Sequence, residues 1–189
     1  QNEFGGGHMI DNAQASLDYL KAELSSLPVK AAEELVEDIG NGYARLNLAA
    51  AKGVFSPETI NAMFVESSNS GGGSASSFIE KLGVLRGLCE RGELPFDRAA
   101  LDNYLTEYEK KGYPPVHHSE SYRAAYAPAY RVVSERYVKY LELISALDAA
   151  LSKKRPVTVA IDGMSASGKS SLAALLAGIF DANVIHMDD

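Results

Sequence analysis

Eight residues near the end of the chain, Gly163 to Ser170, combine glycine, lysine and serine in the spacing G-x-x-x-x-G-K-S. Glycines at 163 and 168 let a loop curl so tightly that successive backbone N–H groups point at one anion. The ammonium of Lys169 can reach terminal phosphate oxygens, and the hydroxyl of Ser170 can join the coordination shell of Mg²⁺. This pattern predicts a cradle for the phosphates of a nucleotide.

The flanking residues fit a strand, a loop and a helix in succession. An apolar run at 157–161 precedes the loop, and small residues suited to a helix fill 171–180. Such a helix would direct the positive end of its dipole at the bound anion. The residues expected to contact the nucleotide are Gly163, Ser165, Ala166, Ser167, Gly168, Lys169, Ser170 and Ser171.

A second apolar run at 183–186 leads into Asp188 and Asp189. Together with Asp162-Gly-Met-Ser-Ala-Ser-Gly-Lys-Ser-Ser171, this arrangement resembles the uridine kinase family of P-loop phosphotransferases, over residues 156–189 only. The resemblance implies ATP and Mg²⁺ as cofactors and Lys169 and Asp188 as catalytic residues. It also implies that Asp188 activates the acceptor hydroxyl and that Ser170 and Asp188 hold the metal.

Three functions stay open at this stage. The first is transfer of the ATP γ-phosphoryl group to a nucleoside or another small hydroxyl acceptor. The second keeps this fold with another acceptor, as in the toxin kinases that phosphorylate nucleotide sugars. The third is a helical interaction module, or a fusion of two partners, in which the P-loop is a remnant. A doubly wound sheet needs more strands than the two candidates, so we expect the front part of a kinase, inactive as this chain.

The remainder of the sequence predicts helices, so the expected fold class is mostly α. A helical hairpin or bundle region would precede the first β-α-β unit of a P-loop α/β kinase fold. Apolar residues spaced by three and four predict helices that end at Pro28, cover 29–52 and open at Ser56. The same spacing predicts two helices on either side of Gly92 and a long helix after Pro128.

Five segments are expected along the chain. Residues 1–9 lack periodicity and read like vector-derived residues ahead of the fold. Residues 70–77, Ser-Gly-Gly-Gly-Ser-Ala-Ser-Ser, have the composition of a flexible linker, either a natural loop or an engineered joint between unrelated polypeptides. Between and beyond them lie an acidic helical segment at 10–69, a helical hairpin or bundle at 78–155 and an incomplete kinase domain at 156–189.

Composition and charge limit the partners. Residues 10–69 carry nine acidic and four basic side chains, which argues against nucleic acid, while their apolar seam favours a protein partner. Cys89 is the only cysteine, so no intramolecular disulfide can form. No run approaches the ~20 apolar residues of a membrane span, and a cytoplasmic protein without a membrane partner is expected. The segment after Pro156 could lack order, pack on the helices or pair with another copy as a homo-oligomer.

Overall fold

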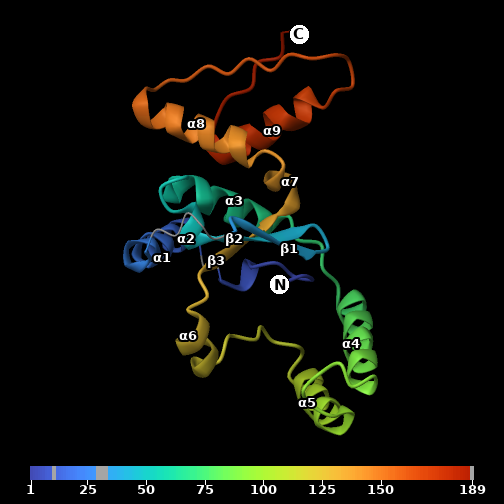
Figure 1. The fold of residues 1–189 in the computed structure, drawn as a ribbon. Coiled ribbons are helices and arrows are strands. Elements are labelled where there is room, and N and C mark those ends of the chain that lie inside the picture. The colour runs from blue at the N-terminus through green and yellow to red at the C-terminus, as the bar shows by residue number, and fades with distance from the viewer. Residues whose placement is uncertain (10–11, 29–33, 188–189) are drawn as a thin grey trace. The chain divides into compact units, whose positions relative to one another are not determined.

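A small sheet built from distant parts of the chain organises the larger part of the molecule (Figure 1). The structure is a computed structural model, and it describes residues 1–9, 12–28 and 34–187. Strands β1 (Val36–Gly40), β2 (Tyr43–Asn47) and β3 (Tyr130–Ser134) lie in the order β1-β2-β3, and both pairs are antiparallel. The described residues are otherwise mostly helical, so the expected mostly-α class fits in this coarse sense.

The helix expected over 29–52 is wrong for the described residues 34–52, which form a β-hairpin and one helical turn. Gly40, Asn41 and Gly42 have φ angles of 74°, 57° and 77°. Three successive positive φ angles are incompatible with a right-handed helix. Asn-Gly between apolar residues is a strong signal for a two-residue hairpin turn, and it outweighs the four-residue spacing that suggested a helix.

Helices on one side of this sheet build the main core. α1 (Ala13–Ser26) starts at Asn12, whose side chain accepts a hydrogen bond from the N–H of Ala15 at 2.8 Å. α2 (Leu48–Ala51) follows β2 directly, and α3 (Pro57–Asn69) starts at the expected cap, Ser56. α3 packs against β3 and α1. The core residues exposed by 1% or less are Leu20, Leu46, Leu48, Ala51, Ile60, Met63, Val133, Tyr137 and Ile144.

The long helix expected after Pro128 is wrong in its first part. Residues 130–134 form β3, and two helices follow, α7 (Glu135–Val138) and α8 (Leu141–Lys153). β3 pairs with β2 from Tyr43↔Ser134 to Asn47↔Tyr130. The β-branched pair Val132 and Val133 suits a strand, and the neighbouring β2 supplies the hydrogen bonds that a helix would otherwise form internally.

The chain divides into two compact units at boundaries that differ from the expected segments. Unit 1 comprises Gln1–Gly71 with Ala129–Asp189, and unit 2 comprises Gly72–Pro128. The glycine-rich stretch does contain one boundary, although its last residues belong to α4 (Ala75–Glu90). The second boundary lies just before β3, because β3 pairs with β2 and so returns the chain to unit 1.

Unit 2 contains the two helices expected on either side of Gly92, packed as a hairpin. α4 and α5 (Arg98–Lys110) enclose a small core of Cys89, Leu101 and Leu105. α5 is capped by Asp97, whose carboxylate accepts a hydrogen bond from the N–H of Ala100 at 2.7 Å. A third helix, α6 (Glu120–Tyr126), follows later in the same unit.

Of the expected β-α-β unit, the described residues form only the helix, α9 (Lys169–Phe180). Neither 157–161 nor 183–186 is a strand. A parallel strand obtains its hydrogen bonds from neighbouring strands and its cover from helices on both faces. Val159 and Ile185 are instead 45% and 83% exposed.

Candidate phosphate-binding site

The loop between Ile161 and α9 folds back on itself. A Cβ atom added to Gly163 would lie 2.9 Å from Ser167 Oγ, closer than real Cβ atoms approach their neighbours. The N–H of Ser167 donates to the carbonyl of Met164 at 3.3 Å. Ala166 and Gly168 have φ angles of 60° and 86°, which turn the chain into the helix. Glycine at 163 leaves room for this closure without a shift of the Ser167 side chain.

The ammonium of Lys169 is held over the loop that precedes it. Its Nζ donates to the carbonyl oxygens of Gly163 at 2.8 Å and Met164 at 2.9 Å. The side chain therefore turns back from the first residue of α9 to the start of the loop. A positive charge therefore lies against the loop.

The first turn of α9 presents polar groups without a side-chain cap. The cap residue is Gly168, which makes no side-chain hydrogen bond to the helix. The first N–H groups of a helix have no partner within it and favour an anion. Ser170 and Ser171, in the same turn, are both exposed. Loop and helix start thus form one exposed surface rich in hydrogen-bond donors.

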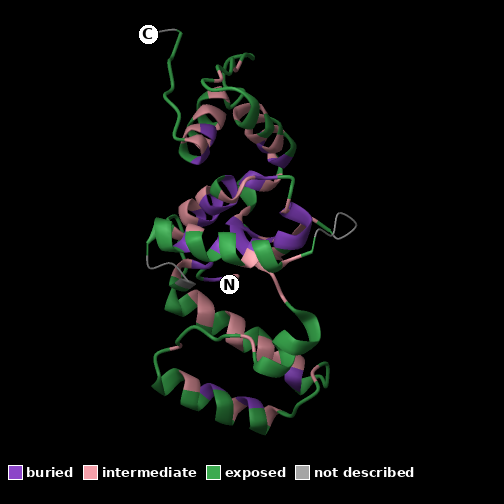
Figure 2. Ribbon diagram, turned by 90° about the vertical axis from the view of Figure 1, so that its left-hand side faces the viewer, coloured by how far each residue is buried: buried purple, intermediate pink, exposed green. Residues whose placement is uncertain are grey.

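The opposite end of α9 is anchored in the core of unit 1. Leu176 and Ile179 are each 7% exposed and belong to the same cluster as Ile60 of α3 and Ile144 of α8. α9 packs against α3. Of the three outcomes considered for the segment after Pro156, α9 follows the second, packing on the helices. In Figure 2 the chain beyond it, towards the marked C-terminus, is drawn as exposed.

The structure gathers the expected nucleotide-binding residues in this loop and first helical turn. The gathered residues are Gly163, Ser165, Ala166, Ser167, Gly168, Lys169, Ser170 and Ser171. The expected acceptor-activating carboxylate, Asp188, lies outside the described residues, and so does the metal pair it would form with Ser170. No group of three or more His, Cys, Asp or Glu side chains that could hold a metal ion occurs within 1–9, 12–28 and 34–187.

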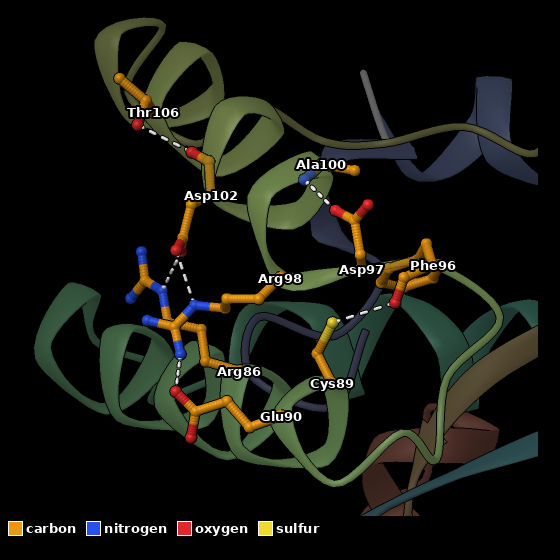
Figure 3. A network of polar contacts seen from close by, with 9 residues as sticks. All are labelled: Arg86, Cys89, Glu90, Phe96, Asp97, Arg98, Ala100, Asp102 and Thr106. Carbon is orange, nitrogen blue, oxygen red and sulfur yellow. Dashed lines mark hydrogen bonds and ion pairs between the residues drawn. The ribbon is translucent and has the colours of Figure 1, made fainter.

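A second polar network joins the two long helices of unit 2 (Figure 3). Asp102 of α5 accepts hydrogen bonds from Arg98 Nε at 2.6 Å and from Arg86 Nε of α4 at 3.0 Å. Arg98 also forms an ion pair with Glu90. The hydrogen bonds from Arg98 and then Arg86 lower the pKa of Asp102 below its usual 3.8. Because the arginines are paired with carboxylates, this network serves to connect α4 and α5.

Sequence reasoning missed two ionic contacts in unit 1. Arg131 of β3 is 9% exposed and pairs with Glu23 of α1, with Nη2 and Oε2 2.8 Å apart. Glu66 of α3 pairs with Arg136 and accepts a hydrogen bond from Tyr137. Each pair joins elements far apart in the chain, so no local spacing rule could have found it. The first pair holds α1, and the second holds α3, to the segment that begins with β3.

Family models, curated proteins and solved structures were all compared with this chain, and none matches. Within the part of the chain that the structure describes, no helix combines the length and apolar character needed to cross a membrane.

Proposed function

We propose that the loop 163–168 and the start of α9 bind the phosphates of a nucleotide, and that the chain is the front part of an ATP-dependent phosphotransferase resembling uridine kinase. The position of Lys169 carries the first half of this proposal. Its ammonium lies 2.8 Å and 2.9 Å from the carbonyl oxygens of Gly163 and Met164. A cation fixed against a tight loop, beside an uncapped helix start, favours a polyanion.

The donor groups at this place suit phosphate oxygens. An ammonium has three N–H groups, and the two carbonyl oxygens use two of them. Further donors are backbone N–H groups within 164–169, other than that of Ser167, which donates to Met164, and the exposed hydroxyls of Ser170 and Ser171. Bound ATP would supply the phosphoryl group, with Mg²⁺ neutralising its oxygens. The chain's own part is to fix the phosphates in position and to offset their charge.

For the acceptor, the support is the sequence resemblance. It assigns to Asp188 the role of orienting a hydroxyl and accepting its proton, with a nucleoside or another small alcohol as the substrate class. A carboxylate at the end of a strand that neighbours the phosphate loop would be well placed for this role. Such a strand would form only when further parallel strands pair with it.

Calorimetric titration of the whole 189-residue chain with Mg-ATP and ADP tests the phosphate site. Lys169→Ala should weaken binding at least ~10-fold, because it removes one charge-assisted donor. Lys154→Ala, which removes the same charge from the exposed end of α8, should change the affinity less than ~2-fold. Absence of binding to the unaltered chain, or equal losses in the two variants, would reject the site.

A turnover assay tests the proposed kinase activity separately from nucleotide binding. In a longer chain that carries the complete domain, Lys169→Ala should lower ADP release from ATP with uridine or cytidine at least ~10²-fold. The 189-residue chain should give no turnover, because only the helix of the expected β-α-β unit forms among its described residues. Robust turnover by the short chain would contradict its proposed incompleteness.

A further inference from the structure

One face of the three-stranded sheet lies outside the main core. Successive strand residues point to opposite sides, so Ala44 and Leu46 face the helices while Tyr43 and Arg45 face the other way. The pairing Arg45↔Val132 and Asn47↔Tyr130 puts Val132 and Tyr130 on this second face too. Yet Tyr43 and Val132 are only 7% and 4% exposed. Something other than the main core covers them.

The cover is the segment of residues 1–9 (Figure 1), whose later residues also contact α3. The amide of Gln1 donates from Nε2 to Tyr130 Oη at 2.7 Å and accepts from Arg45 Nε at 3.0 Å. Asn2 donates from Nδ2 to the carbonyl of Ile39 at 2.5 Å, and its own carbonyl accepts from Asn41 Nδ2 at 2.7 Å. The first two residues therefore form hydrogen bonds with all three strands and with the turn between β1 and β2.

The glycines of the segment fit where side chains would not. A Cβ on Gly6 would lie 2.5 Å from Cε2 of Phe64, a ring that is itself only 3% exposed in α3. A Cβ on Gly5 would lie 3.2 Å from the ring of Tyr43, at a residue whose φ is already +61°. A Cβ on Gly7, by contrast, would meet nothing closer than 3.6 Å. The surface thus selects glycine at two particular positions of its occupant.

We propose that this face, with Tyr43, Arg45, Tyr130 and Val132, forms a peptide-binding surface together with Phe64 of α3, which contacts the same segment. Its ligand is a segment with amide side chains followed by glycines packed on Tyr43 and Phe64. Residues 1–9 fill that role within the same chain. The specificity has two parts. Hydrogen bonds with Arg45, Tyr130 and the hairpin recognise the amides, whereas the ring of Phe64 disfavours a Cβ at Gly6 and the positive φ of Gly5 favours glycine there.

Competition in the full chain tests the surface. The probe is a labelled synthetic peptide of residues 1–9, added to unaltered, Gly6→Ala and Gly7→Ala chains. A tethered segment acts at an effective concentration on the order of 1 mM, so it should block the free peptide in the unaltered and Gly7→Ala chains. Gly6→Ala should displace the tethered segment through its clash with Phe64. We expect the free peptide to bind that chain at least ~10-fold more tightly.

Two further measurements keep the result interpretable if Gly6→Ala disturbs folding. Hydroxyl-radical labelling of Tyr43 and Tyr130 should rise in Gly6→Ala and stay unchanged in Gly7→Ala. Gln1→Ala loses two exposed hydrogen bonds and leaves the core untouched, so it should raise labelling of Tyr130 while the chain stays folded. Equal peptide binding and equal labelling in the two glycine variants would overturn the proposal. A dimer that excess peptide converts to monomer would assign the occupant to a second copy and would overturn the arrangement within one chain.

Discussion

Tyr137 donates a hydrogen bond to the same carboxylate oxygen of Glu66 that forms an ion pair with Arg136. This shared oxygen joins α7 to α3. Burial raises the pKa of Glu66, but the hydrogen bonds from Arg136 and Tyr137 outweigh it and bring the pKa below its usual 4.5. Burial, and then the hydrogen bond to Glu66, raises the pKa of Tyr137 from 10.0 to about 12. The carboxylate is held charged and the phenol is held protonated.

The stability that Tyr137 contributes should disappear in alkali. Above its usual pKa of 10.0, the unfolded chain loses the phenol proton while the folded chain keeps it until about 12. The contribution is therefore complete below the lower value and declines as pH rises, by about 1.4 kcal/mol per pH unit. In urea unfolding, the destabilisation caused by Tyr137→Phe should shrink over this range. Tyr126→Phe, at a ring 71% exposed, should show no such trend. A destabilisation by Tyr137→Phe that stays constant with pH would contradict the assignment.

The hairpin turn should be sensitive to a single methyl group. Gly42→Ala places a Cβ at a residue with φ +77° and nothing within 4 Å, so the cost is one of backbone conformation alone. We expect a loss of roughly 1–2 kcal/mol in the free energy of unfolding. Gly72→Ala is the matched control, because its surroundings are equally open and its φ is not positive. Equal effects of the two substitutions would show that the turn does not hold this conformation.

Packing of α9 on unit 1 can be measured with two identical substitutions. Ile179 is 7% exposed within the main core, whereas Ile185, in the segment after the helix, is 83% exposed. Ile179→Ala should destabilise unit 1 by about 2–5 kcal/mol, since it removes buried methyl groups and leaves a cavity. Ile185→Ala should change stability by less than ~0.5 kcal/mol. Thermal unfolding followed by near-ultraviolet circular dichroism reports both, and an unchanged transition in Ile179→Ala would mean that α9 lies free of the core.

Cutting the chain at the glycine-rich boundary tests the two-unit arrangement. A protease site in place of 72–74 would fall before α4, outside the helices. After cleavage, we expect the fragments to stay associated on size-exclusion chromatography, because β3 pairs with β2 and packs against α3. Separated by denaturant, each fragment should lose the sheet. Fragments that part under native conditions with their helicity intact would instead support two independent polypeptides joined at 70–77.

Local chemistry in the sequence determined several elements correctly. Ser56 caps α3 as expected, and Asn12 and Asp97 cap α1 and α5 in the same way, because each side-chain oxygen needs only an N–H three residues away. The α4–α5 hairpin and the tight turn into α9 at 163–168 are also local patterns. The Gly40-Asn41-Gly42 turn is likewise a local signal, and at this place turn chemistry outweighs the apolar spacing that favours a helix.

Only the tertiary structure decided which distant segments meet. Val133 and Tyr137 fit the four-residue spacing of a helix, yet the presence of β2 made residues 130–134 a strand. The ion pairs Glu23–Arg131 and Glu66–Arg136 form only because the pairing of β3 with β2 brings these distant segments together. At the other extreme, 157–161 has the composition of a strand and forms none among the described residues. A helix closes its hydrogen bonds within one segment, but a strand exists only where another strand supplies them.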